Sequence, residues 1–280
     1  QLHVVATLGE IGPDSAAAVP QLIQLLGHDD EAIRRVAAKS LGFIGPAAKS
    51  AVPRLIAALH DKAGSVTLHA AEALGRMGPD AAPELTAGLK DEKLRHWAAI
   101  ILGDIGPAAK MAVPDLINAL QDPQPDVRRE AVIALAHIGP DAQPAVPALL
   151  KLLNSSEMID PRGGAAYALG KIGAKEAIPD LQKTLQNKDD QNLRIASAWA
   201  LVMLDPDNKQ VLVDAVPQLL LAAKHPWVLA RREAMTALGK VGSVAKAAVP
   251  ALTVALDDTD AGVRNEALVA LAEMGPDAAP

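Results

Sequence analysis

The chain of 280 residues contains no cysteine. This absence excludes disulfides, thiolate nucleophiles and thiolate metal ligands, but it suits either redox environment and therefore indicates no location. Aromatic residues are also scarce, since three Trp, one Tyr and one Phe stand among 50% apolar residues. The core must therefore be built from Ala, Leu and Val, and such small side chains predict closely approaching helices.

Long apolar runs and excess positive charge are missing as well. No stretch of 18 apolar residues occurs, so we expect no membrane-spanning helix. The formal net charge is −6, whereas nucleic-acid binders usually carry a basic stripe. The composition therefore argues against DNA or RNA as the partner.

Catalytic and metal-binding signatures are equally absent. The chain has no GxSxG, GxGxxG or GxxxxGK[ST] pattern, so nucleophile elbows and phosphate loops lack support. None of the seven histidines has another at i+3 or i+4, the spacing that lets one helix face supply two metal ligands. We predict a protein that is not an enzyme and that has no cofactor and no metal.

What the chain does contain is a repeat of about 33 residues. A glycine preceded by an apolar residue returns at this period, with a leucine four positions before it. The pairs are Leu8/Gly12, Leu41/Gly45, Leu74/Gly78, Leu102/Gly106, Leu135/Gly139, Leu169/Gly173, Leu238/Gly242 and Leu271/Gly275, and Asp205 replaces the glycine after Leu201. Self-similarity at this period predicts stacked supersecondary units.

Residues 113–139 illustrate the unit, which reads as two amphipathic helices. Pro114 suits the opening turn of the first helix, since its missing N–H loses no intrahelical partner there. In the second helix apolar residues recur at spacings of three and four, and Gly139 is expected to supply a left-handed cap. The helix-opening proline recurs as Pro20, Pro53, Pro83, Pro114, Pro147, Pro179, Pro217 and Pro250. About eight helical hairpins are therefore predicted, in an all-α, right-handed solenoid.

We expect residues 1–280 to form a single array with one irregular junction around 205–216, where a longer loop or a longer first helix replaces the regular connection. Both ends look cut, because residues 1–11 read as a second helix without a first and residues 275–280 begin a unit that does not follow. Solenoids normally end in polar capping repeats. Further repeats or another chain are therefore expected to cover the ends.

The units AVPALLKLL and VRREAVIALAHIG resemble HEAT repeats, in particular the short type named after phycobilisome lyases, over essentially the whole chain. This resemblance implies the armadillo/HEAT-like fold. It does not choose a function, because the repeat type occurs in bilin lyases, in enzyme accessory domains and in scaffolds.

Seven of the units carry an arginine eleven residues before the glycine position. A guanidinium can bond bidentately to the acidic residues and the carbonyls of the preceding turn, and a role shared by almost every repeat is structural. We therefore predict a structural Asp/Arg ladder. Its arginines are Arg34, Arg95, Arg128, Arg162, Arg194, Arg231 and Arg264.

The positions ten, six and two residues before the glycine share one outward stripe of each second helix, because four-residue steps keep to one face. They usually carry charge in this repeat type, yet the central units place bulky apolar residues there. We expect an exposed concave strip that binds a partner, since large apolar side chains exposed together mark binding surfaces. The predicted strip comprises Trp97, Ile100, Ile133, Tyr167, Trp199 and Met203, with His96, Arg129, His137 and Lys171 beside them.

Three functions remain open on these grounds. The first is a non-enzymatic scaffold that binds a peptide, helix or protein segment in the groove. The second follows the resemblance to bilin lyases, whose groove would hold an open-chain tetrapyrrole. The third is an accessory arm of a larger multidomain protein, with the groove filled by another segment of that protein.

Overall fold

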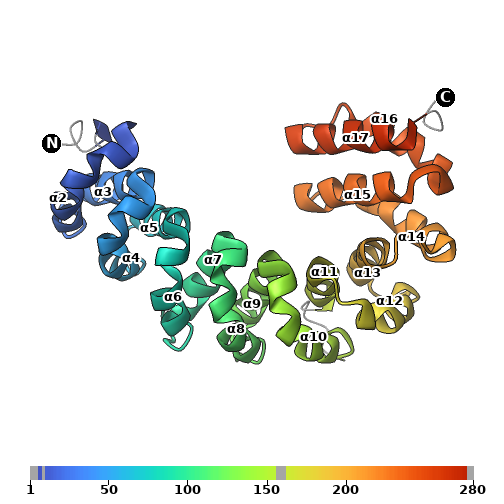
Figure 1. Ribbon diagram of the computed structural model, residues 1–280, viewed down its shortest axis with the longest axis horizontal. Coiled ribbons are helices and arrows are strands. Elements are labelled where there is room, and N and C mark those ends of the chain that lie inside the picture. The colour runs from blue at the N-terminus through green and yellow to red at the C-terminus, as the bar shows by residue number, and fades with distance from the viewer. Residues whose placement is uncertain (1–5, 8–9, 156–161, 276–280) are drawn as a thin grey trace. The chain divides into compact units, whose positions relative to one another are not determined.

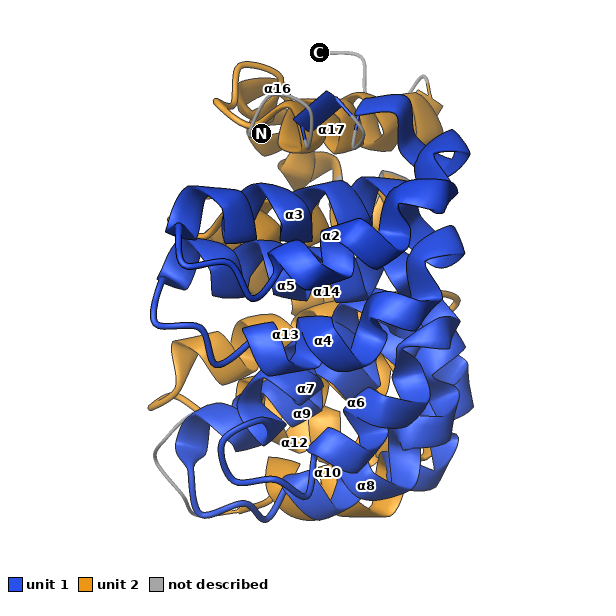
Figure 2. Ribbon diagram, turned by 90° about the vertical axis from the view of Figure 1, so that its left-hand side faces the viewer, with its two compact units in different colours: residues 1–145 blue, residues 146–280 orange. Residues whose placement is uncertain are grey.

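The computed structural model describes residues 6–7, 10–155 and 162–275. The chain divides into two compact units, unit 1 comprising residues 1–145 and unit 2 residues 146–280 (Figure 2). Within the described ranges each unit contains four helical hairpins and no strand. Eight hairpins match the predicted number, while one continuous array across both units stays a prediction. The two predicted cut ends lie largely outside the described residues.

The hairpins of unit 1 pair a short first helix with a longer second helix. The first helices are α2 (Val19–Leu25), α4 (Val52–Ala58), α6 (Ala82–Gly88) and α8 (Val113–Ala119). The second helices are α3 (Glu31–Ile44), α5 (Gly64–Met77), α7 (Arg95–Ile105) and α9 (Pro125–Ile138). Figure 1 shows them as two rows, and successive second helices pack directly against one another.

Unit 2 repeats the arrangement with one irregular hairpin. Its first helices are α10 (Val146–Leu153), α12 (Ile178–Leu185), α14 (Lys209–Ala222) and α16 (Val249–Ala255). Its second helices are α11 (Arg162–Ile172), α13 (Gln191–Leu204), α15 (Val228–Val241) and α17 (Ala261–Met274). Of the described helices, none is long and apolar enough to cross a membrane.

A 3₁₀ segment joins most second helices to the next first helix, which the periodicity did not predict. In η2 (Gly45–Ala51) the Gly-Pro pair opens the segment, and Ala48 and Ala51 are fully buried. The other segments are η1 (Gly12–Ala18), η3 (Gly78–Asp80), η4 (Gly106–Ala112), η5 (Gly139–Ala145), η6 (Lys175–Ala177) and η7 (Gly242–Ala248). The regular repeat therefore contains three helical pieces, with small residues between the two main helices.

The glycine after every second helix except α13 has a positive φ, between +57° and +84°. At Gly45 the pair is φ +67°, ψ −139°, and at Gly139 it is φ +71°, ψ −138°. These ψ values lie outside the left-handed helical region, so the predicted left-handed cap is wrong in that detail. The backbone instead takes a conformation open to glycine because it lacks Cβ. Asp205 takes another path, with φ −138° and ψ 59°.

The irregular junction is a longer first helix. Asn208 caps α14 by accepting a hydrogen bond from the Val211 amide (3.4 Å), so the helix begins at Lys209 and Pro217 lies inside it. The expectation that Pro217 opens this helix is therefore wrong. The asparagine cap starts the helix upstream, and the proline costs one backbone hydrogen bond within it.

Buried leucines and close alanine contacts form the core. Leu41, Leu74, Leu102 and Leu135, each four residues before the glycine, are fully buried. Between second helices the contact is closer still, because a Cβ on Gly103 would lie 3.2 Å from the Cα of Ala134. The small residues of the sequence thus let the backbones of neighbouring repeats approach, as their abundance predicted.

Candidate functional site

Each second helix packs one face against its first helix. We call the opposite face of the second helices, which is open to solvent, the inner face of the unit. In unit 1 this face carries the predicted stripe positions. Arg35, Lys39 and Phe43 on α3 are exposed, and so are Asp104 on α7 and His137 on α9. The stripe periodicity therefore identifies solvent-facing positions in this unit.

The unit 1 part of the predicted strip is half-buried. Trp97 and Ile100 of α7 and Ile133 of α9 are each intermediate in exposure, and α7 packs directly on α9. We call these three residues the α7/α9 strip. The His96 ring meets Trp97 edge to face, with centroids 6.0 Å apart and planes at 70°. The strip thus offers apolar surface that is partly packed and partly open.

Polar groups beside the α7/α9 strip are held by local contacts. Arg129 pairs with Asp126 (2.8 Å) and Glu130 (3.4 Å), so its positive charge is partly neutralised. His137 places Nδ1 3.2 Å from the carbonyl oxygen of Gly103 on α7. Desolvation raises the pKa of Asp104, although the nearby His137 acts in the opposite direction. The border of the strip is therefore polar, with charges of both signs.

In unit 2 the corresponding aromatic residues contact one another. Trp199 is only 5% exposed, so the expectation that its ring faces solvent is wrong. The ring packs against Gly170 of α11, where an added Cβ would lie 2.6 Å from Cζ3 of Trp199. The missing side chain at 170 leaves the space that the indole fills, and Tyr167 covers it with ring centroids 4.7 Å apart.

Tyr167 and Lys171 extend this cluster from α11 across to α15. The Tyr167 hydroxyl donates a hydrogen bond to Oε1 of Glu233 (2.8 Å), and the Lys171 ammonium lies 3.5 Å from the same oxygen. Nζ of Lys171 also stands 5.5 Å from the Tyr167 ring centroid and 5.7 Å from that of Trp199. Tyr167 is half-buried as a result, while Met203 is half-buried and Lys171 exposed. We call Tyr167, Lys171, Trp199 and Glu233 the clasp.

Two exposed apolar residues of the unit 1 inner face lie outside the predicted strip. Phe43 is 41% exposed and Leu68 is 52% exposed. Cζ of Arg76 lies 4.6 Å from the Phe43 ring centroid, and Nζ of Lys39 lies 5.6 Å from it. The stripe rule could have found both residues, because Phe43 stands two positions before Gly45 and Leu68 ten before Gly78. We call Arg35, Lys39, Phe43 and Arg76 the α3/α5 patch.

The periodic arginines lie at the turns between the paired helices. Arg34 bonds Asp61 of the next repeat through Nε (2.7 Å) and Nη2 (2.9 Å), and Nη1 reaches the carbonyls of His28 and Asp29. The same arrangement recurs where Arg231 pairs with Asp258. A single ion pair of 3.1 Å joins Arg95 to Asp122.

The remaining arginines of the series differ in their partners. Arg128 and Arg264 each donate to two carbonyls of their own preceding turn, and Arg162 donates to the carbonyl of Leu153. Nε of Arg194 is buried with no hydrogen-bond partner among the described residues. In each of the three ion pairs above, the aspartate stands 27 residues after the arginine.

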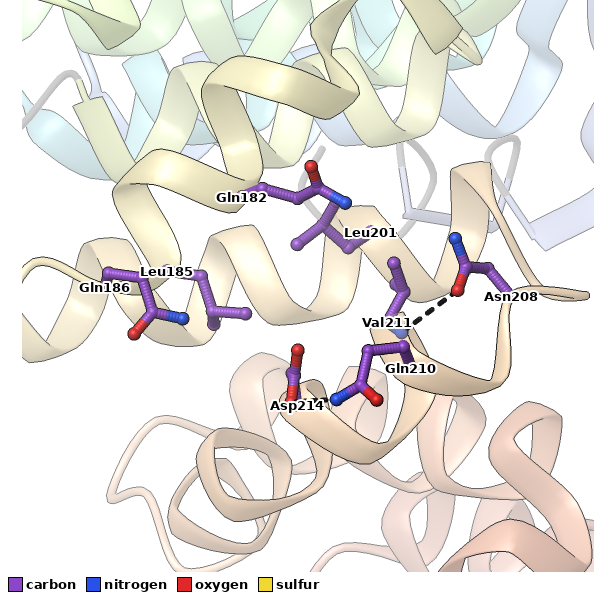
Figure 3. A pocket seen from close by; sticks show the side chains of 8 residues that line it. All are labelled: Gln182, Leu185, Gln186, Leu201, Asn208, Gln210, Val211 and Asp214. Carbon is purple, nitrogen blue, oxygen red and sulfur yellow. Dashed lines mark hydrogen bonds between the residues drawn. The ribbon is translucent and has the colours of Figure 1, made fainter.

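A pocket of about 430 Å³ opens at the irregular junction of unit 2 (Figure 3). Leu185, Leu201 and Val211 form its apolar side, and the polar side chains are Gln182, Gln186, Asn208, Gln210 and Asp214. Gln210 donates to Asp214 (2.8 Å), so part of the polar wall bonds to itself. Among the residues that the structure describes, no three His, Asp or Glu side chains converge as a metal site.

The protein-family model for HEAT repeats matches the sequence at residues 1–75, 19–93, 82–159, 146–219 and 213–280, which together span the chain. The chain belongs to the HEAT-repeat family. The finer phycobilisome-lyase-like type stays a prediction. HEAT-repeat solenoids typically act as protein-interaction scaffolds and are generally not enzymes.

Two solved structures are similar to this HEAT-repeat chain. One is a mutant of Kap121p, a helical solenoid, with a TM-score of 0.64 and 16% sequence identity. The match covers 98% of this chain and 35% of the Kap121p chain. An engineered protein has a TM-score of 0.46 at 24% identity and covers 98% of this chain and 84% of its own. The chain thus spans about a third of Kap121p, and that likeness concerns the solenoid fold alone. No curated protein matches the chain.

Proposed function

We propose that this HEAT-repeat chain is a non-enzymatic scaffold that holds a peptide, helix or protein segment against the inner face of unit 1. The observation that carries the proposal is the α7/α9 strip, where Trp97, Ile100 and Ile133 leave apolar surface partly open on two adjacent helices. Tryptophan is enriched among interface hot spots, and interfaces have an apolar centre with a polar border.

The clasp residues of unit 2 are buried or already engaged with one another, so we do not assign the docking face to unit 2. Trp199 is buried, and Tyr167 and Lys171 already contact Glu233 and each other. A partner that used these side chains would first have to break those contacts. The predicted anchors Tyr167 and Trp199 therefore act within the fold, and the anchors of the docking face lie in unit 1.

The bilin-handling alternative rests on the resemblance of the repeat alone. Of the histidines that could meet a tetrapyrrole propionate, His69 pairs with Glu72 (3.0 Å) and His137 contacts Gly103. Both histidines thus contact groups of the protein itself, and neither contact favours a tetrapyrrole as the ligand. A protein segment fits the apolar strip and its mixed-charge border better.

Site-specific photocrosslinking in cells tests the scaffold. A benzophenone amino acid replaces Ile133 on the inner face or, as the matched control, the exposed Asn118 of α8. We expect one recurring partner segment to crosslink at position 133 and not at 118, and Trp97→Ala to remove this adduct while the helical circular dichroism is kept. Equal crosslinking at both positions, or an adduct unaffected by Trp97→Ala, would overturn the proposal.

A further inference from the structure

The α3/α5 patch combines an exposed ring with cations from two repeats. Arg76 of α5 and Lys39 of α3 flank Phe43 at the distances given above, and Arg35 stands two turns earlier on the same stripe of α3. All four residues are exposed. A cation near an aromatic face at an exposed site contributes only weakly to stability, so these side chains can turn toward a new partner at small cost.

These cations have no carboxylate partner within the described part of the chain. Among the described residues no carboxylate lies within 4.0 Å of Arg35, Lys39 or Arg76. Glu72 stands one turn before Arg76 on α5, but its carboxylate pairs with His69 instead. By contrast Arg129 and Lys171, on the predicted strip, do have acidic partners. The patch is therefore a local excess of positive charge on a chain whose net charge is −6.

The rest of the unit 1 inner face restricts what can occupy the patch. Glu72, one turn before Arg76 on α5, and Asp104 on the outward stripe of α7 are acidic and exposed. They would repel a phosphate backbone that ran on from the patch. Leu68 and the α7/α9 strip offer apolar surface on the same face. Charge complementarity and this apolar surface together suit a peptide that carries both carboxylates and apolar side chains.

We infer that the α3/α5 patch receives the acidic side chains of a peptide segment whose apolar side chains contact Phe43 and the adjoining inner face. The inference rests on the proposed scaffold function and names the chemistry of its partner. Carboxylates of the segment pair with Lys39 and Arg76, with Arg35 adding to the attraction. The contacts are solvent-exposed, so binding weakens as salt rises.

The test measures fluorescence anisotropy of short labelled synthetic peptides with the full chain. The probes are a Glu/Leu/Phe peptide, the same peptide with Lys for Glu, the same peptide with Gln for Glu, and an oligothymidylate. We expect the Glu peptide to bind, the Lys and Gln peptides to bind at least about tenfold more weakly, and the affinity for the Glu peptide to fall between about 50 and 200 mM salt.

Two double variants with equal changes in net charge locate the binding. Lys39→Glu/Arg76→Glu should weaken binding of the Glu peptide by about tenfold or more. Lys49→Glu/Arg54→Glu, whose residues are exposed on η2 and α4, should weaken it by less than about twofold. Phe43→Ala should lower affinity without removing the salt dependence. Circular dichroism checks that each variant is folded.

Several results would overturn the inference. They are equal binding of the three peptides, equal losses in both double variants, or an oligothymidylate that binds more tightly than the Glu peptide and depends on Lys39 and Arg76. If the Glu peptide fails while the crosslink at position 133 persists, the acidic partner is wrong and the scaffold stands. If both fail, the inner face of unit 1 is not a docking surface.

Discussion

The Tyr167 hydroxyl donates a 2.8 Å hydrogen bond to Glu233, 66 residues further along the chain. Tyr167 lies on α11 and Glu233 on α15, so the bond passes over α13 and joins repeats that are not sequence neighbours. In a solenoid most contacts link adjacent units. This bond therefore adds a tie across three repeats of unit 2, above the buried Trp199.

The titration of Tyr167 tests that tie. Burial first, and then the charge of Glu233 and the hydrogen bond to it, raise the pKa of Tyr167 well above its ordinary value. Tyr167 is the only tyrosine, so tyrosinate absorbance reports it alone. We expect tyrosinate to form in the folded protein only as helical circular dichroism is lost, whereas the urea-unfolded chain titrates near pH 10.

The same shift predicts how stability depends on pH. The folded state keeps the phenol proton at pH values where the unfolded chain has lost it, so the contribution is complete below about pH 10 and is lost as the pH rises further. Tyr167→Phe should lower the free energy of unfolding by about 1 kcal/mol at neutral pH and flatten its fall in alkali. A native tyrosinate signal near pH 10 would contradict this reading.

Two glycines at the same repeat position should respond oppositely to alanine. A Cβ on Gly42 would lie 3.0 Å from the Cα of Ala73, but a Cβ on Gly75 would meet only Cβ of Asp104 at 3.7 Å. Gly42→Ala should destabilise by about 1–3 kcal/mol through overpacking. Gly75→Ala should stabilise by about 0.5–1 kcal/mol through helix propensity. Urea unfolding midpoints of the two variants check this, and shifts of the same sign would argue against the close approach.

The Arg34–Asp61 ion pair should contribute more to thermal stability than the exposed Arg35. Arg34→Lys loses the bidentate geometry and the carbonyl bonds, so the thermal midpoint should fall further than for Arg35→Lys, whose residue is exposed and has no ion pair among the described residues. The Arg34 guanidinium, by its hydrogen bond, holds the pKa of Asp61 below its ordinary range.

Acid should remove the stabilisation that the Arg34–Asp61 pair provides. Because the pKa of Asp61 is depressed in the folded state, the stabilisation is present above about pH 4 and is lost as the pH falls through the folded value. The gap in thermal midpoint between wild type and Arg34→Lys should therefore narrow from pH 5 to pH 3. A difference in thermal midpoint that does not change with pH would mean that only the hydrogen bonds from Arg34 to the carbonyls of His28 and Asp29 stabilise the fold.

Features set by local patterning could be predicted from the sequence. The Leu and Gly series marked the second helices because a buried leucine and a glycine with positive φ recur in most repeats. The outward stripe was correct at Phe43, His137 and Lys171, which are exposed. These positions follow from helix geometry alone, and no distant residue changes them.

Features set by contacts between repeats could not be predicted in this way. Trp199 occupies an outward stripe position, yet its ring is buried because Gly170 of the previous repeat has no side chain. The hydrogen bond from Tyr167 to Glu233 depends on how α11, α13 and α15 pack, which the repeat pattern does not fix. The early start of α14 has a local cause instead, because it follows from the cap at Asn208, whereas the position of Pro217 suggested a later start.

The most direct test of the docking face is fluorine NMR of the 5-fluorotryptophan-labelled protein, whose three signals are assigned with single Trp→Phe variants. In the free protein we expect a soluble quencher to reach Trp227, which is 61% exposed, to reach Trp97 partly and not to reach Trp199. Adding the segment crosslinked at position 133 should shift and protect Trp97 and leave Trp199 unchanged. A Trp199 signal that is quenched in the free protein, or that moves while Trp97 does not, would place the docking face in unit 2 and contradict the account.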